Sequence, residues 1–133
     1  MTRFAIDAAV AVLLVRRARA VPEAHRLVAP NVLMSDALAT LHDEVRRGLL
    51  SERDGRAQLE GLAALRIRLL GDRVSRANAW QLADRLDPPD TRRAEYLAVA
   101  RLQADALVTL DDELRAAADG IVPVADVDDL WSD

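Results

Sequence analysis

The 133-residue sequence contains no cysteine and only two histidines, and it draws all its basic side chains from arginine. Without thiols the chain can form neither disulfides nor thiolate metal sites. His25 and His42 fall in two different predicted helices, which argues against a zinc site. Any metal ion bound here is therefore expected to be a hard cation, Mg²⁺ or Mn²⁺, held by carboxylate oxygens.

The sequence also lacks an apolar run long enough to cross a membrane. The first stretch, MTRFAIDAAVAVLLVRR, is interrupted by Asp7 and closed by Arg16 and Arg17. A transmembrane helix needs about 20 consecutive apolar residues, and the interrupted run does not have the form of a signal peptide either. We therefore expect a cytoplasmic protein that has no membrane partner.

Composition indicates one globular domain over residues 1–133, because 51% of the residues are hydrophobic and 30% are charged. No internal repeat or low-complexity linker divides the chain. The formal net charge of −4 does not favour nucleic acid as a partner. It does not exclude one, because a local basic patch matters more than the sum of charges.

The hydrophobic pattern predicts strands that alternate with helices. Strands are predicted at residues 3–6, 67–70, 106–110 and 121–124. Helices are predicted at 8–17, in a short segment that contains His25 and ends at Pro30, and at 31–47, 51–65, 72–86, 91–102 and 111–118. This order predicts an α/β fold, a three-layer α/β/α sandwich with a small, mostly parallel sheet and an acidic tail at about 126–133.

Acidic residues stand where two predicted strands end. Asp7 follows the first strand, and Asp111 and Asp112 follow the continuously apolar strand at 106–110. Sites in open α/β sheets gather at the carboxyl ends of the strands. Taken alone, Asp7 is also explained as the N-cap of the next helix. Asp36 lies beside the apolar stripe of its helix, and taken alone it is explained as a solvated acid on the surface.

Three stretches resemble the PIN-domain family, and more narrowly the VapC toxins of type II toxin–antitoxin pairs. They are FAIDAAVAVLL, APNVLMSDALATLHDEVRRGLL and TRRAEYLAVARLQADALVTLDDELRAAA. The resemblance implies a PIN-like fold and an endoribonuclease that depends on Mg²⁺ or Mn²⁺. Such an ion activates water and stabilises the charge that develops on the scissile phosphate. The resemblance also implies a VapB-like antitoxin, an RNA substrate and a homodimer.

The site residues carry over from the family incompletely. Asp7, Asp36 and Asp111 match three catalytic, metal-binding acids, although the family usually has Glu at the position of Asp36. Asp90 and Asp112 are additional candidate ligands. Ala9 stands where the family often has a small hydroxyl residue.

Arg93 occupies the position of the remaining family acid. It shares a helical side with Tyr96 and Leu97, so we expect its guanidinium to point toward the sheet and to lie among Asp7, Asp36 and Asp111. There it would neutralise part of the charge that recruits a metal ion.

Three arginines, Arg46, Arg47 and Arg92, are candidate contacts to the RNA backbone. Alternatively, each lies on a solvated helix face.

Three interpretations of the whole chain follow. It is a metal-dependent ribonuclease toxin weakened by Arg93, a catalytically degenerate PIN-fold binding or regulatory protein, or an α/β domain with scattered acids.

Overall fold

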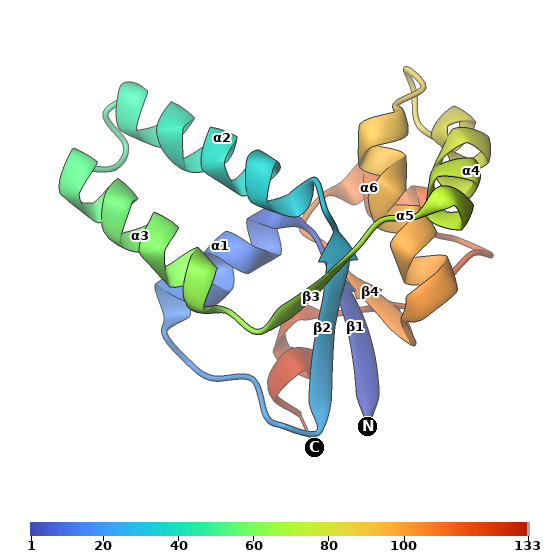
Figure 1. Ribbon diagram of the computed structural model, residues 1–133, viewed down its shortest axis with the longest axis horizontal. Helices are drawn as coiled ribbons and strands as arrows, with labels where there is room; N and C mark the ends of the chain where they lie inside the picture. Colours follow the sequence, from blue (N-terminus) through green and yellow to red (C-terminus); the bar gives the residue numbers. More distant parts are fainter. Residues whose placement is uncertain (133) are drawn as a thin grey trace.

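Five parallel strands form one sheet at the centre of the computed structural model, which describes residues 1–132 (Figure 1). The strand order is β3-β2-β1-β4-β5, and every neighbouring pair is parallel. The strands are β1 (Thr2–Ile6), β2 (His25–Pro30), β3 (Ile67–Leu70), β4 (Ala106–Val108) and β5 (Val124–Ala125). The predicted α/β sandwich with a parallel sheet is confirmed.

Helices cover both faces of the sheet. In Figure 1, α1, α2 and α3 are grouped on one side of the strands, and α4, α5 and α6 on the other. The helices are α1 (Ala8–Arg17), α2 (Leu33–Arg46), α3 (Glu52–Ala64), α4 (Arg73–Leu82), α5 (Thr91–Gln103) and α6 (Asp112–Ala117), with short 3₁₀ helices η1 (Ala83–Arg85) and η2 (Val127–Trp131). Within residues 1–132, no helix is both long and apolar enough to cross a membrane.

The central strands are buried on both faces, as expected for a parallel sheet between two helical layers. All three residues of β4 are buried, and so is Thr109, which follows it. Ile6 of β1 and Leu97 of α5 are fully buried in the same core. This core fixes the carboxyl ends of β1 and β4 side by side.

The prediction of a short helix around His25 is wrong, because this segment is strand β2. Its residues pair in register with β1, His25 opposite Thr2 and Val28 opposite Ala5. The run from Leu27 to Pro30 is buried, so pairing in the sheet outweighs the local pattern that predicted a helix. The imidazole Nδ1 of His25 lies 2.7 Å from the carbonyl oxygen of Leu130.

The end of the chain also differs from its prediction. The last strand comprises Val124 and Ala125, where residues 121–124 were expected. Much of the predicted acidic tail is ordered structure, because η2 buries Leu130 in the core. Asp133, the last residue of that predicted tail, lies outside the described residues.

Candidate functional site

The fold brings Asp7, Asp36 and Asp111 to the carboxyl edge of the sheet. Asp7 follows β1 and Asp111 follows β4, and these neighbouring strands pair Ile6 with Val108. Asp36 lies in the first turn of α2, which follows β2 on the other side of β1. The predicted convergence of three acids therefore has a structural basis, since three adjacent strands deliver them.

Asp7 is buried, and both of its carboxylate oxygens accept hydrogen bonds. Oδ1 accepts from the backbone amide of Val10 at 2.9 Å and so caps α1. Oδ2 accepts from the hydroxyl of Thr109, which is itself fully buried. Burial raises the pKa of Asp7 above its ordinary value even though both hydrogen bonds oppose the shift. Sequence reasoning missed Thr109.

Asp36 is held by two side chains of α5. The hydroxyl of Tyr96 donates to Oδ2 at 2.6 Å, and Arg92 Nη2 lies 2.5 Å from Oδ1. Burial raises the pKa of Tyr96 well above its ordinary value, and Asp36 adds to the shift. Tyr96 therefore stays protonated and remains a hydrogen-bond donor to the carboxylate.

Asp111 is the N-cap of α6 and the partner of a guanidinium. Its Oδ1 accepts from the backbone amides of Glu113 and Leu114 at 3.0 and 3.1 Å. Its Oδ2 accepts from Arg93 Nη2 at 2.5 Å, and Arg93 Nη1 also lies 3.3 Å from Glu113 Oε1. Burial alone would raise the pKa of Asp111, but the Leu114 amide and Arg93 outweigh it and lower this pKa.

The expectation that Arg93 lies among all three acids needs correction. Arg93 pairs with Asp111 and Glu113, whereas Asp36 is paired with Arg92. Successive residues of an α-helix diverge by about 100°, so the two neighbouring arginines reach acids on different elements. The neutralisation of carboxylate charge that was predicted for Arg93 alone is therefore divided between Arg92 and Arg93.

The additional candidate ligands have other contacts. Asp90 caps α5, its Oδ1 accepting from the backbone amide of Arg93 at 3.1 Å. Asp112 is exposed at the start of α6. Glu95 of α5 has a pKa raised by burial and by the charge of Asp36. Glu95 therefore lies within electrostatic reach of the site.

Two of the arginines proposed for RNA contacts lie far from the acids. Arg46 and Arg47 are exposed at the carboxyl end of α2, about 15 Å along the helix from Asp36 by the rise of 1.5 Å per residue. Figure 1 shows this end of α2 projecting away from the sheet. Of the three arginines, Arg92 is the one beside the acid edge.

The three acids are chemically suited to Mg²⁺ or Mn²⁺, which prefer carboxylate oxygens. Each of their six oxygens, however, already accepts from an amide, a hydroxyl or a guanidinium. No group of three or more His, Cys, Asp or Glu within residues 1–132 is placed to hold a metal ion. With a guanidinium on Asp36 and another on Asp111, the three acids as arranged are not grouped to hold a divalent cation.

No protein-family model matches the sequence, and no curated protein is similar to it. Among solved structures, the chain is similar to the crystal structure of PAE2754 from Pyrobaculum aerophilum. The TM-score is 0.76 at 22% sequence identity, over 98% of this chain and 93% of that chain. At this identity the likeness supports the fold and carries nothing about activity.

Proposed function

We propose that this chain is a VapC-like protein with a PIN-type fold that binds a VapB-like antitoxin but does not catalyse metal-dependent RNA cleavage. The observation that carries the proposal is the pairing of Arg92 with Asp36 and of Arg93 with Asp111, each at 2.5 Å. These guanidiniums occupy the carboxylate oxygens that a divalent cation would need. A fixed positive charge also repels such a cation.

The likeness to the VapC family motivates the protein partner, and one exposed apolar surface suits a second copy of the chain. A groove of about 370 Å³ between α2 and α3 is lined by Met34, Leu38, Leu59 and Leu62, among others. Leu38 is 50% exposed and Leu59 is 41% exposed. Exposed apolar patches are typical of protein interfaces, and we propose this groove as the homodimer contact.

A second candidate function is a weak Mg²⁺- or Mn²⁺-dependent endoribonuclease of the same family. It is favoured by the convergence of three acids and by the exposure of Arg92, whose side chain is 55% exposed. An ion pair this exposed contributes only about 0–1 kcal/mol, so Arg92 could leave Asp36 at little cost. Arg93, at 32% exposure and with two acidic partners, is the stronger obstacle.

Calorimetric titration with Mg²⁺ and with Mn²⁺ distinguishes the two candidates. The proposal expects no binding to the wild-type protein and measurable binding to Arg93→Asp, which restores the family acid. The double variant Asp7→Asn/Arg93→Asp is the matched control, and it should lose that binding again. Each protein is also incubated with total RNA and the ion.

Metal binding by the wild-type protein that disappears in Asp7→Asn, together with RNA cleavage, would replace the proposal with the second candidate. Failure of Arg93→Asp to gain affinity while it remains folded would show that the arginine is not what excludes the ion.

A further inference from the structure

A second charged region lies at the opposite edge of the sheet from the acids. It is a groove of about 890 Å³ around the amino-terminal ends of β1, β2 and β3. Arg3 and Asp7 stand near opposite ends of β1, about 13 Å apart at a rise of 3.3 Å per residue. This groove is therefore separate from the acid edge, and the inference drawn from it does not depend on the proposed function.

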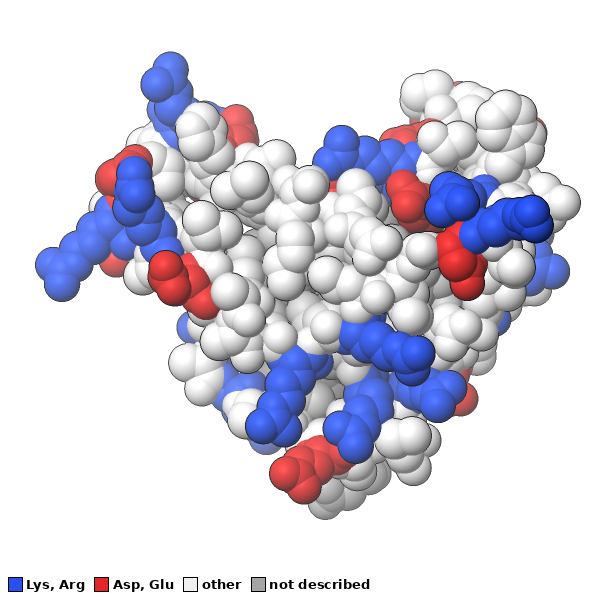
Figure 2. Space-filling model, viewed as in Figure 1, with Lys and Arg blue, Asp and Glu red and all other residues white. Residues whose placement is uncertain are grey.

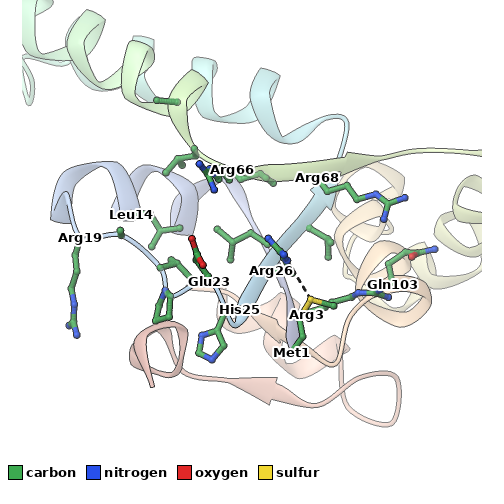
Figure 3. A pocket seen from close by; sticks show the side chains of 18 residues that line it. Met1, Arg3, Leu14, Arg19, Glu23, His25, Arg26, Arg66, Arg68 and Gln103 are labelled. Atoms are coloured by element: carbon green, nitrogen blue, oxygen red, sulfur yellow. Dashed lines mark hydrogen bonds between the residues drawn. The ribbon is translucent and has the colours of Figure 1, made fainter. Parts of the chain in front are cut away.

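Five arginines and a single acid line the groove, although the whole chain carries a net charge of −4. The arginines are Arg3, Arg19, Arg26, Arg66 and Arg68, and the acid is Glu23. Figure 2 shows basic side chains gathered on the lower part of the molecule, where the strands begin in Figure 1. Figure 3 shows Arg3, Arg26, Arg66 and Arg68 around the first residues of β1, β2 and β3.

The sheet register places three of the arginines side by side. Arg3 is the in-register partner of Arg26 across β1 and β2. Arg66 precedes Ile67, which pairs with Leu27, so the same register sets Arg66 beside Arg26. Paired residues of neighbouring strands point to the same face, and like charges placed opposite one another are destabilising.

The guanidiniums of the groove are not paired inside the protein. Within residues 1–132, none of the five lining arginines forms an ion pair with a carboxylate, that of Glu23 included. Within residues 1–132, the guanidinium of Arg26 makes one hydrogen bond, from Nε to the sulfur of Met1 at 3.4 Å. An unneutralised row of guanidiniums across three strands indicates an anionic ligand from outside the chain.

The shape of the groove favours an acidic peptide over nucleic acid. Apolar residues also line it, among them Val21, Leu27, Leu65 and Ile67. Successive residues of a strand point to opposite faces, so Leu27 and Ile67 face away from Arg26 and Arg68. Within residues 1–132, no Phe, Tyr or Trp lines the groove, although His25 does, whereas single-stranded nucleic acid is usually held by stacking its bases on aromatic rings. An extended ligand that alternates carboxylates with apolar side chains matches both sets of lining residues.

Strand β3 lies beside these arginines and offers backbone hydrogen-bonding groups to a ligand. β3 is an edge strand, and both Arg68 and Leu69 on it are exposed. An extended peptide can add to such an edge by main-chain hydrogen bonds, with alternate side chains on opposite faces. We infer that the groove docks an acidic, extended segment of a partner protein along β3, with its carboxylates on Arg66 and Arg68.

A fluorescein-labelled decapeptide of alternating Glu and Val tests the inference by fluorescence anisotropy on the full chain. We expect binding that weakens at least tenfold in Arg66→Glu/Arg68→Glu and weakens as salt is raised. Arg53→Glu/Arg73→Glu is the matched control, since both residues are exposed arginines outside the groove and the change in charge is the same. This control should bind like the wild-type protein.

Circular dichroism melts establish that each variant is folded, and Arg68→Gln provides a milder second variant with an expected smaller loss of affinity. A Lys–Val decapeptide should not bind. The inference is overturned if the Glu–Val peptide does not bind, or if both double variants weaken it equally. Binding of dodecauridylate at Arg66 and Arg68 in place of the peptide would overturn it in favour of RNA.

Discussion

Arg93 and Asp111 form a 2.5 Å ion pair that joins the first turn of α5 to the N-cap of α6. The guanidinium of Arg93 lies between two acids and attracts both Asp111 and Glu113. This contact should therefore stabilise the fold.

We predict that Arg93→Gln lowers the free energy of unfolding at pH 7 by about 1 kcal/mol, the value for a partly exposed ion pair. Because Arg93 helps to hold the pKa of Asp111 below the ordinary 3.8, its contribution is full above that value. It is lost as pH falls through the lowered folded pKa, where Asp111 becomes protonated. Urea unfolding at pH 7 and near pH 2.5 measures the difference.

Arg56→Gln is the control for this prediction, since its ion pair with Glu52 lies on an exposed helix face and should contribute little. If Arg93→Gln costs the same stability at both pH values, the side chain acts through packing and not through its charge.

The charge of ionised Asp7 should destabilise the folded protein, whereas its hydrogen bond as the N-cap of α1 should stabilise it. Its pKa is raised by burial, so the ionised form is disfavoured in the folded state, and this penalty is complete above the raised pKa. We predict that Asp7→Asn raises the melting temperature at pH 7, because Asn still caps α1. Asp7→Ala should instead cost about 1–2 kcal/mol through the lost cap.

Thermal melts at pH 7 and pH 3.5 check this pair of variants. The advantage of Asp7→Asn should shrink at pH 3.5, below the unfolded value of 3.8, where Asp7 is mostly protonated in both folded and unfolded states. An Asn variant less stable than wild type at pH 7 would contradict the predicted charge penalty.

Tyr96 offers a direct optical test, because it is the one tyrosine of the sequence. Burial and the hydrogen bond to Asp36 raise its pKa. We predict that the folded protein shows no tyrosinate absorbance at 295 nm at the ordinary pKa of 10.0. The same protein in 6 M guanidinium should titrate near that value. Titration near 10 while the protein remains folded would show that the Tyr96–Asp36 contact is not maintained.

Much of the architecture could be predicted because it rests on local patterns. The continuous apolar run at 106–110 indicated a strand buried on both faces, which β4 forms over Ala106–Val108, whereas Leu110 is exposed. Ser51 and Asp72 mark the starts of α3 and α4 as N-caps. Strand β2 could not be recognised in the same way. Its formation depends on pairing with β1, a contact between segments distant in the chain, which no local propensity encodes.

The site was predictable at the level of strand ends and not at the level of side-chain contacts. Asp7 and Asp111 follow strands that sequence alone located, so their meeting at one edge follows from topology. Which of Arg92 and Arg93 reaches which acid depends on the rotation of α5 about its axis. A one-residue difference turns a side chain by about 100°, and hydrophobic periodicity does not resolve that angle.

Arg26 provides the last prediction, since it stands between Arg3 and Arg66 in neighbouring strands. Replacing it with Thr, a good strand former, removes two repulsive neighbours, each worth about 0.2–1 kcal/mol. We therefore expect Arg26→Thr to be more stable than wild type by about 0.4–2 kcal/mol in urea unfolding at low salt.

The gain in stability of Arg26→Thr should shrink in 1 M NaCl, because the electrostatic screening length falls to about 3 Å. It should also be accompanied by weaker binding of the Glu–Val peptide, because Arg26 contributes to the positive charge of the groove. Arg26→Thr that is less stable than wild type at low salt would show that the guanidinium is already neutralised, and the anion-binding role of the groove would lose its basis.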